Sequence, residues 1–160
     1  MKKVLLLYGT RPEAIKMAPI IKKFQENKSS YDLIVCSTGQ HKDMLGSVET
    51  FFDIKPDIQL NVNMKEPSLS KKYAELIFKM SDKLSEVKPD KVIVHGDTLS
   101  AVSTAMAAFM NNVQVLHVEA GLRTNTRKLP FPEEFNRRTI TNLASIHFAP
   151  TQSAFNNLIN

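Results

Sequence analysis

Short apolar runs rich in β-branched residues alternate along this chain with longer patterns that have helical spacing. Four of the apolar runs are clear and a fifth is weaker; they lie at 4–8, 33–36, 91–94, 113–118 and 146–149. Between them, apolar residues recur every three or four positions at 17–24 and 69–87, and the segment 99–110 is apolar almost all round. Strand, helix and strand in this order predict an α/β fold, a Rossmann-like parallel sheet with helices on both faces.

Length and composition set the class of protein. A chain of 160 residues is one ordinary domain, so we predict a single domain over 1–160. Its 42% hydrophobic and 23% charged residues are typical of a globular protein rather than a disordered or fibrous one. Cys36 is the only cysteine, which excludes a disulfide framework within the chain and favours a cytoplasmic location. The apolar stretch after Lys3 ends at Tyr8, too early for a signal peptide, and no run predicts a membrane span.

The net charge of +5 predicts an anionic partner. The lysines are scattered over the predicted helices, as in "KKFQENK" and "KKYAELIFK", and aromatic residues are not interleaved with them. We therefore expect a small phosphorylated ligand and no nucleic acid.

Glycines and polar side chains come together where the predicted strands end. Four of the five glycines follow a strand: Gly9, Gly39, Gly96 and Gly121. Polar residues come at the same turns: Arg11, Gln40, His41, Asp97 and Glu119. In an open parallel sheet the ligand crevice lies outside the carboxyl ends of the strands, so we expect these side chains to share one edge.

The first of these turns, "YGTRPEAIK", places Arg11 and Lys16 around the start of a helix. Backbone N–H groups and two cations make such a helix start suitable for an anion. The alternative is a plain turn in which Arg11 pairs with Glu13 on the surface, and the sequence leaves both open. The turn matches neither G-x-G-x-x-G nor a Walker A loop, so the usual dinucleotide and ATP motifs are missing.

Two consecutive strands end in a histidine followed two residues later by a carboxylate. The first is His95 and Asp97 in "HGD", and the second is His117 and Glu119 in "HVE". Residues two apart on a strand share a face, so we predict that His117 and Glu119 point the same way and that both carboxylates face one cleft. Asp97 or Thr98 could instead only cap the next helix. A metal site is disfavoured because no further His or Cys falls at ligand spacing.

A third polar segment, "LPFPEEFNRR", reads as the start of a helix. Pro132 suits its first turn, Glu133 and Glu134 suit its positive end, and Arg137 follows one turn later. Either this is ordinary helix-starting chemistry, or the rigid loop aims Glu133 back at the strand ends.

Taken together and in this order, "GTRPEAIKMAP", "TGQH", "VHGDT", "HVEAGLRT" and "PFPEEFNR" resemble the non-hydrolysing UDP-N-acetylglucosamine 2-epimerases, from Met1 to the end of the chain. That family has two Rossmann-like domains in the GT-B arrangement, with the active site between them. The resemblance implies that this chain is the N-terminal domain and that the second, C-terminal domain is absent from it. It also implies a homodimer in the full-length family, and leaves open a separate C-terminal half as partner.

The resemblance further implies a reaction for bacterial surface polysaccharide synthesis. UDP leaves C1 of UDP-N-acetylglucosamine as the C2 proton is lost, 2-acetamidoglucal forms, and UDP adds back with the proton on the opposite face. Such a reaction needs acids and bases near both faces of the sugar and no metal or nicotinamide cofactor. By position, the catalytic carboxylates are Asp97, Glu119 and Glu133. The substrate-binding residues are Arg11, Lys16, Gln40, His41, His95 and Arg137.

Three departures from the family pattern qualify these expectations. "LSAV" follows HGDT where many members carry threonines. Asp43 and Glu66 are acidic where allosterically regulated members are polar or basic, so we expect no such regulation. Without the second domain, we expect little or no activity from this chain alone. The alternatives are a hydrolysing epimerase that releases N-acetylmannosamine, a GT-B glycosyltransferase half, and a non-catalytic nucleotide-sugar-binding fragment.

Overall fold

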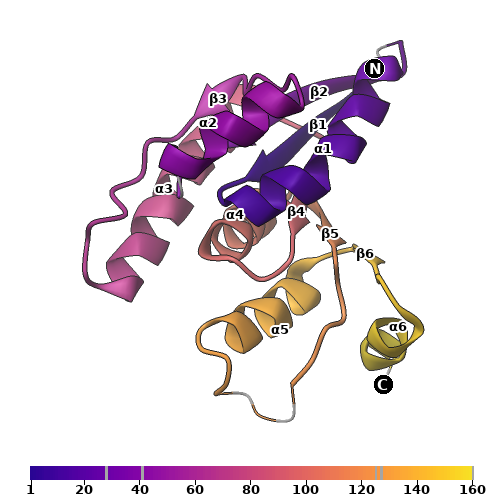
Figure 1. Cartoon of the computed structure of the whole chain (residues 1–160). Coiled ribbons are helices and arrows are strands. Elements are labelled where there is room, and N and C mark those ends of the chain that lie inside the picture. Colours follow the sequence, from indigo (N-terminus) through magenta and orange to yellow (C-terminus); the bar gives the residue numbers. More distant parts are fainter. Residues whose placement is uncertain (28, 41, 125, 127, 160) are drawn as a thin grey trace.

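In a computed structural model of the chain, strands and helices alternate from one end to the other (Figure 1). The structure describes residues 1–27, 29–40, 42–124, 126 and 128–159, leaving aside the side chains of residues 42 and 43. The elements are β1 (Lys2–Tyr8), α1 (Arg11–Glu26), β2 (Tyr31–Ser37), α2 (Lys42–Phe51), β3 (Ile58–Gln59), α3 (Leu69–Val87), β4 (Lys91–His95), α4 (Leu99–Met110), β5 (Gln114–Val118), α5 (Glu133–Leu143), β6 (Ile146–Phe148) and α6 (Gln152–Ile159).

The strands form one sheet in the order β3-β2-β1-β4-β5-β6, and every neighbouring pair is parallel. The predicted parallel sheet is therefore confirmed. Strand order reverses between β1 and β4, which are neighbours in the sheet although two strands separate them in the chain. At such a reversal the connections leave β1 and β4 toward opposite faces, and a crevice opens at their carboxyl ends.

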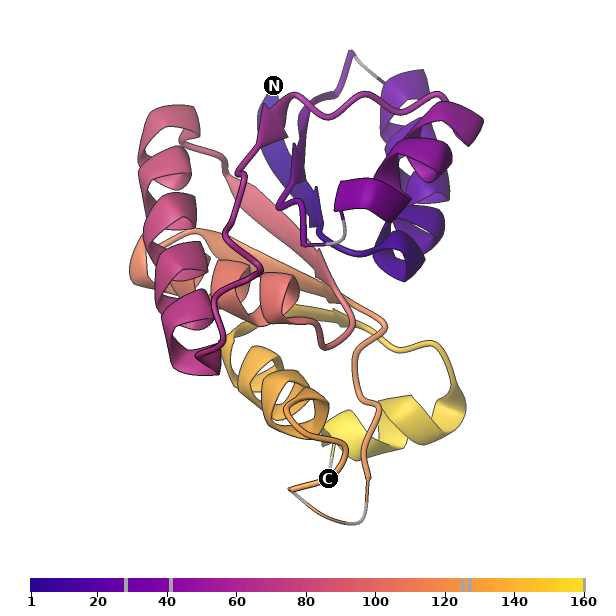
Figure 2. The same ribbon diagram turned by 60° about the vertical axis from the view of Figure 1, so that its left-hand side comes forward.

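Helices cover both faces of the sheet. Figure 2 shows α1 and α2 on one side of it, and α3 and α4 on the other. Val4, Leu6 and Tyr8 pack in the cluster that includes α1, whereas Leu5 and Leu7 pack in the cluster that includes α3 and α4. A strand buried on both faces needs a continuous apolar run, which explains why β1 does not alternate with polar residues.

Two N-terminal caps hold the helices that start at the carboxyl edge of the sheet. Thr10 caps α1 and forms a capping box with Glu13, and the hydroxyl of Thr98 accepts a hydrogen bond from Ala101 N (3.0 Å) at the start of α4. The described helices include none that is long and apolar enough to cross a membrane.

Candidate active site

The carboxyl ends of β1, β4 and β5 lie side by side, and the turn after β4 stands at their centre. Gly96 adopts a left-handed conformation (φ +65°) that favours glycine. Its N–H donates to the carbonyl of Val118 (2.9 Å), and Nε2 of His117 lies 2.7 Å from its carbonyl oxygen. These two contacts join the end of β4 to the end of β5. The residues that follow the two strands, Asp97 and Glu119, therefore leave the sheet at neighbouring positions.

Glu119 does not share a face with His117, and that prediction was wrong. β5 ends at Val118, and Glu119 has φ +63°, so strand alternation stops one residue before it. The carboxylate of Glu119 forms an ion pair with Lys16 of α1, and its Oε2 lies 3.5 Å from His95 Nε2. Its Oε1 lies 3.8 Å from the point where a Cβ on Gly96 would stand. Glu119 therefore belongs to the α1 side of the crevice.

Asp97 is held from the other side, by α5. Its Oδ2 accepts hydrogen bonds from Nε (3.1 Å) and Nη2 of Arg137, and its carbonyl oxygen accepts one from Asn136 Nδ2 (2.8 Å). Thr98, not Asp97, caps α4. The carboxylate of Asp97 is thus paired with a cation from α5.

Arg11 and Lys16 have different surroundings, although both flank the start of α1. Arg11 is exposed, and among the described residues it forms no ion pair. Glu13 does not pair with it, so the surface-pair interpretation was wrong. Glu13 is buried and accepts hydrogen bonds from Gly9 N (3.0 Å), Thr10 N (2.7 Å) and the hydroxyl of Thr98 (2.7 Å). Burial raises the pKa of Glu13, and these donors act in the opposite direction.

His95 is buried next to Glu119 and faces the α1 side of the sheet. Burial lowers the pKa of His95, and the nearby charge of Glu119 partly opposes that change. The imidazole is therefore mainly neutral at pH 7 and can take part in a hydrogen bond without adding a positive charge. Nδ1 of His95 has no hydrogen-bond partner in the described part of the chain.

The two glutamates at the start of α5 have opposite environments. Glu134 is completely buried and accepts hydrogen bonds from Arg137 Nη1 (3.2 Å) and Arg138 Nε (2.6 Å). Glu133 is half-buried one helical turn before Arg137. Burial is the main cause that raises the pKa of Tyr73 on α3, and the charge of Glu133 adds to it.

Gln40 lies at the same edge, next to the start of α4. Its Oε1 accepts a hydrogen bond from the hydroxyl of Ser100 (2.7 Å), which is also 2.7 Å from the hydroxyl of Thr38. His41 lies outside the described residues, as does the side chain of Asp43. Glu66 accepts a hydrogen bond from Ser68 N (3.0 Å) before α3.

The structure therefore joins most of the predicted site residues in two groups. One group is Lys16, His95 and Glu119, and the other is Asp97 with Arg137. Sequence reasoning missed Glu134, Asn136 and Tyr73, which support the second group. One signal was available, since Glu134 precedes the two arginines by three and four positions. The described residues hold no cluster of three His, Cys, Asp or Glu side chains that could bind a metal ion.

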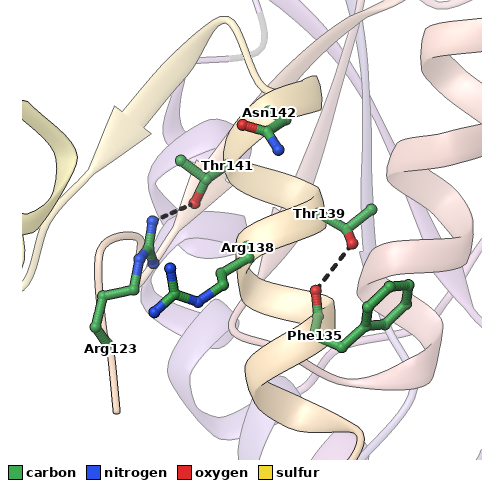
Figure 3. Close-up of a pocket in the computed structure, with 6 residues that line it drawn as sticks. All are labelled: Arg123, Phe135, Arg138, Thr139, Thr141 and Asn142. Carbon is green, nitrogen blue, oxygen red and sulfur yellow. Dashed lines mark hydrogen bonds between the residues drawn. The ribbon is translucent and has the colours of Figure 1, made fainter. Parts of the chain in front are cut away.

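A separate cavity of about 390 Å³ lies against α5, and none of the predicted site residues lines it. It is lined by Arg123, Phe135, Arg138, Thr139, Thr141 and Asn142. Figure 3 shows the Arg123 and Arg138 side chains next to one another beside α5, with Arg123 bonded to Thr141 (3.1 Å). This cavity is distinct from the strand ends.

Comparison with known proteins decides the family. The family model described as UDP-N-acetylglucosamine 2-epimerase matches residues 22–160. The chain belongs to this family. It is 48% identical over 158 residues to the UDP-N-acetylglucosamine 2-epimerase of Campylobacter jejuni, covering 99% of this chain and 41% of the relative. The chain thus spans about two fifths of the length of the curated relatives that it matches.

Solved structures of epimerases have the same fold over this part. The enzyme of Neisseria meningitidis bound to UDP-GlcNAc has a TM-score of 0.93 at 45% identity, with 98% of this chain and 43% of that chain covered. The enzyme of Methanocaldococcus jannaschii in complex with UDP-GlcNAc and UDP has a TM-score of 0.89 at 34% identity, with 99% and 43% covered. MurG of Acinetobacter baumannii is only 16% identical, with a TM-score of 0.72 and with 97% of this chain and 42% of that chain covered. At this identity the likeness is evidence for the fold and for nothing more. The predicted half of a GT-B-like architecture is confirmed.

Proposed function

We propose that this chain is the N-terminal domain of a non-hydrolysing UDP-N-acetylglucosamine 2-epimerase, which interconverts UDP-N-acetylglucosamine and UDP-N-acetylmannosamine. A second, C-terminal domain supplies the rest of the nucleotide site, so the 160 residues alone turn over little or no substrate. The whole enzyme is cytoplasmic and dimeric, and serves bacterial surface polysaccharide synthesis.

The observation that carries this proposal is the pairing of Asp97 and Glu119 with cations from opposite faces of the sheet. Lys16 reaches Glu119 from α1, and Arg137 reaches Asp97 from α5. Asp97 directly follows Gly96 in the chain, and Glu119 Oε1 lies 3.8 Å from the point where a Cβ on Gly96 would stand. A sugar ring placed between them would have one carboxylate near each face, which an inversion at C2 requires.

The chemistry divides into two halves that mirror each other. In the first, a carboxylate takes the proton from C2, the C1–O bond breaks, and its electrons leave with UDP while a C1–C2 double bond forms. In the second, UDP attacks C1 and the opposite residue, which is a protonated carboxylic acid from the start, donates its proton to C2. The two residues thus end the reaction with their protonation states exchanged. Lys16, Arg11 and Arg137 stabilise the negative charge that develops on the diphosphate.

The relatives support the substrate class. The Neisseria meningitidis enzyme was crystallised with UDP-GlcNAc, and it matches this chain over 98% of its residues. The predicted substrate-binding residues Arg11, Gln40 and His95 lie at the edge where a nucleotide sugar would be placed next to Asp97 and Glu119. Glu133, the third proposed catalytic carboxylate, lies on α5 one turn before Arg137.

The decisive experiment combines this chain with the C-terminal part of an epimerase and follows exchange of the C2 proton in deuterated water. Asp97→Asn and Glu119→Gln should each lower the exchange rate by about 10²- to 10⁴-fold, the range for loss of an acid or base. Glu86→Gln removes the charge of an exposed carboxylate that pairs with Lys83 on the surface of α3, and serves as the matched control. Exchange that survives both active-site substitutions would refute the assigned roles.

Product analysis separates the alternatives. UDP-linked N-acetylmannosamine is the expected product, whereas free N-acetylmannosamine would indicate a hydrolysing epimerase. Transfer of the sugar to an acceptor would indicate a glycosyltransferase. Binding without turnover by the combined halves would indicate a non-catalytic fragment.

A further inference from the structure

Asp97 is held by its backbone as well as by its side chain. Arg137 binds the carboxylate, and the neighbouring residue on α5, Asn136, donates from Nδ2 to the Asp97 carbonyl (2.8 Å). Asn136 is buried, with 1% of its surface exposed. Two adjacent side chains of one helix thus bind the carboxylate and the backbone carbonyl of the same aspartate.

Tyr73 of α3 determines which way the Asn136 amide is turned. Its hydroxyl donates a hydrogen bond to Asn136 Oδ1, which leaves Nδ2 directed at the carbonyl of Asp97. Turning the amide over would place an NH₂ group against the hydroxyl and an oxygen against a carbonyl oxygen. Burial raises the pKa of Tyr73, so the hydroxyl keeps the proton that it donates.

His117 holds the preceding carbonyl from the opposite direction. Its Nε2 lies 2.7 Å from the oxygen of Gly96, and the ring is completely buried. The carbonyls of Gly96 and Asp97 are therefore both bound by side chains, one from β5 and one from α5. The glycine in the turn has no side chain to limit its backbone, so these bonds, together with the one from Gly96 N–H to Val118, restrict the turn.

We propose that Asn136, oriented by Tyr73, is a positioning residue that fixes the backbone of Asp97 and hence the direction of its carboxylate. The proposal rests on the proposed function, because it assigns Asn136 a purpose through the role of Asp97. Neither Asn136 nor Tyr73 acts on the reacting atoms. A carboxylate displaced by about 1 Å can lose on the order of 10²-fold in rate, so such a contact has a large effect on turnover.

The test uses Tyr73→Phe, which removes only the hydroxyl. The matched control is Tyr31→Phe, because Tyr31 is exposed at the start of β2. The first measurement is amide hydrogen exchange at Gly96 in the 160-residue chain. We expect exchange about 5- to 10-fold faster in Tyr73→Phe and unchanged in Tyr31→Phe, as for the loss of one hydrogen bond. Unchanged exchange at Gly96 in Tyr73→Phe would overturn the proposal.

The second measurement is turnover by the chain combined with the C-terminal part. Tyr73→Phe should lower kcat by about 10-fold or more and leave KM within about 3-fold, because positioning acts in the transition state. A higher KM with unchanged kcat would also overturn the proposal. Asn136→Ala should give a larger loss of kcat. If Asn136→Ala does not fold, the result for Tyr73→Phe decides the positioning role. If the unsubstituted pair shows no turnover, the proposed function fails, whereas hydrogen exchange at Gly96 still decides the positioning role.

Discussion

His117 should make the stability of this protein fall as the pH drops below neutral. The ring is completely buried, and its Nε2 lies 2.7 Å from the Gly96 carbonyl oxygen. Burial is the main cause that lowers the pKa of His117 from its ordinary 6.5 to about 4. In the folded protein the imidazole therefore stays neutral at pH values where the unfolded chain binds a proton.

The direction and size of the effect follow from these two pKa values. Because the folded pKa is the lower one, the contribution to stability is fully present above pH 6.5 and is lost as the pH falls from 6.5 toward 4. Proton linkage predicts that His117 alone removes about 2 kcal/mol of unfolding free energy between about pH 7 and pH 5. That is a large share of the stability of an ordinary domain.

Urea unfolding at pH 7, 6 and 5 measures this effect. His117→Gln keeps a side-chain N–H donor but does not titrate, so its unfolding free energy should fall by about 2 kcal/mol less than that of the unsubstituted protein over the same interval. Equal losses in the two proteins would refute the reasoning. So would a nuclear magnetic resonance titration in which the His117 ring takes up its proton near pH 6.5.

Two further predictions concern the packing of the fold. Gly121→Ala should lower the unfolding free energy by more than about 2 kcal/mol in urea titrations, because Gly121 has φ +88° and a Cβ there would lie 2.1 Å from the carbonyl oxygen of Ala154. In α2, a Cβ added at Gly46 would have no described atom outside its own helix backbone within 4 Å, so Gly46→Ala should instead stabilise the protein by about 0.5–1 kcal/mol. Equal effects of the two substitutions would contradict this account. Cys36 is buried and its pKa is raised to about 12 by burial, so the folded protein should react with a thiol reagent at pH 8 only after unfolding, and rapid labelling of the native chain would contradict its burial.

Local patterns in the sequence were enough to predict the elements of this fold. The apolar runs predicted β1, β2, β4, β5 and β6. In β1 the physical reason is that a strand buried on both faces must be apolar over its buried part. β3, with two residues at the edge, is too short to produce a pattern. Parallel order also predicted that the polar turns would meet at one edge, and Lys16, Glu119, Asp97 and Arg137 do meet there.

The surroundings of individual side chains could not be predicted in this way. The sequence expected Glu119 beside His117, but the positive φ of Glu119 turns its carboxylate toward Lys16, 103 positions earlier in the chain. One of the two interpretations of the first turn placed Glu13 at the surface in a pair with Arg11, but Glu13 is buried and accepts a hydrogen bond from the hydroxyl of Thr98. Both outcomes depend on contacts between segments that are distant in the chain.

By itself, then, the sequence determined the succession of strands and helices, the edge that carries the polar groups and the family motifs, because each is written in residues near one another. Only the tertiary structure decided which cation pairs with which carboxylate and which glutamate of α5 is buried. It also decided that Asn136 binds the backbone of Asp97 and that Tyr73 binds Asn136. The physical reason is that the backbone angles of a turn and the partners of a charge are set by whatever the rest of the fold packs against them.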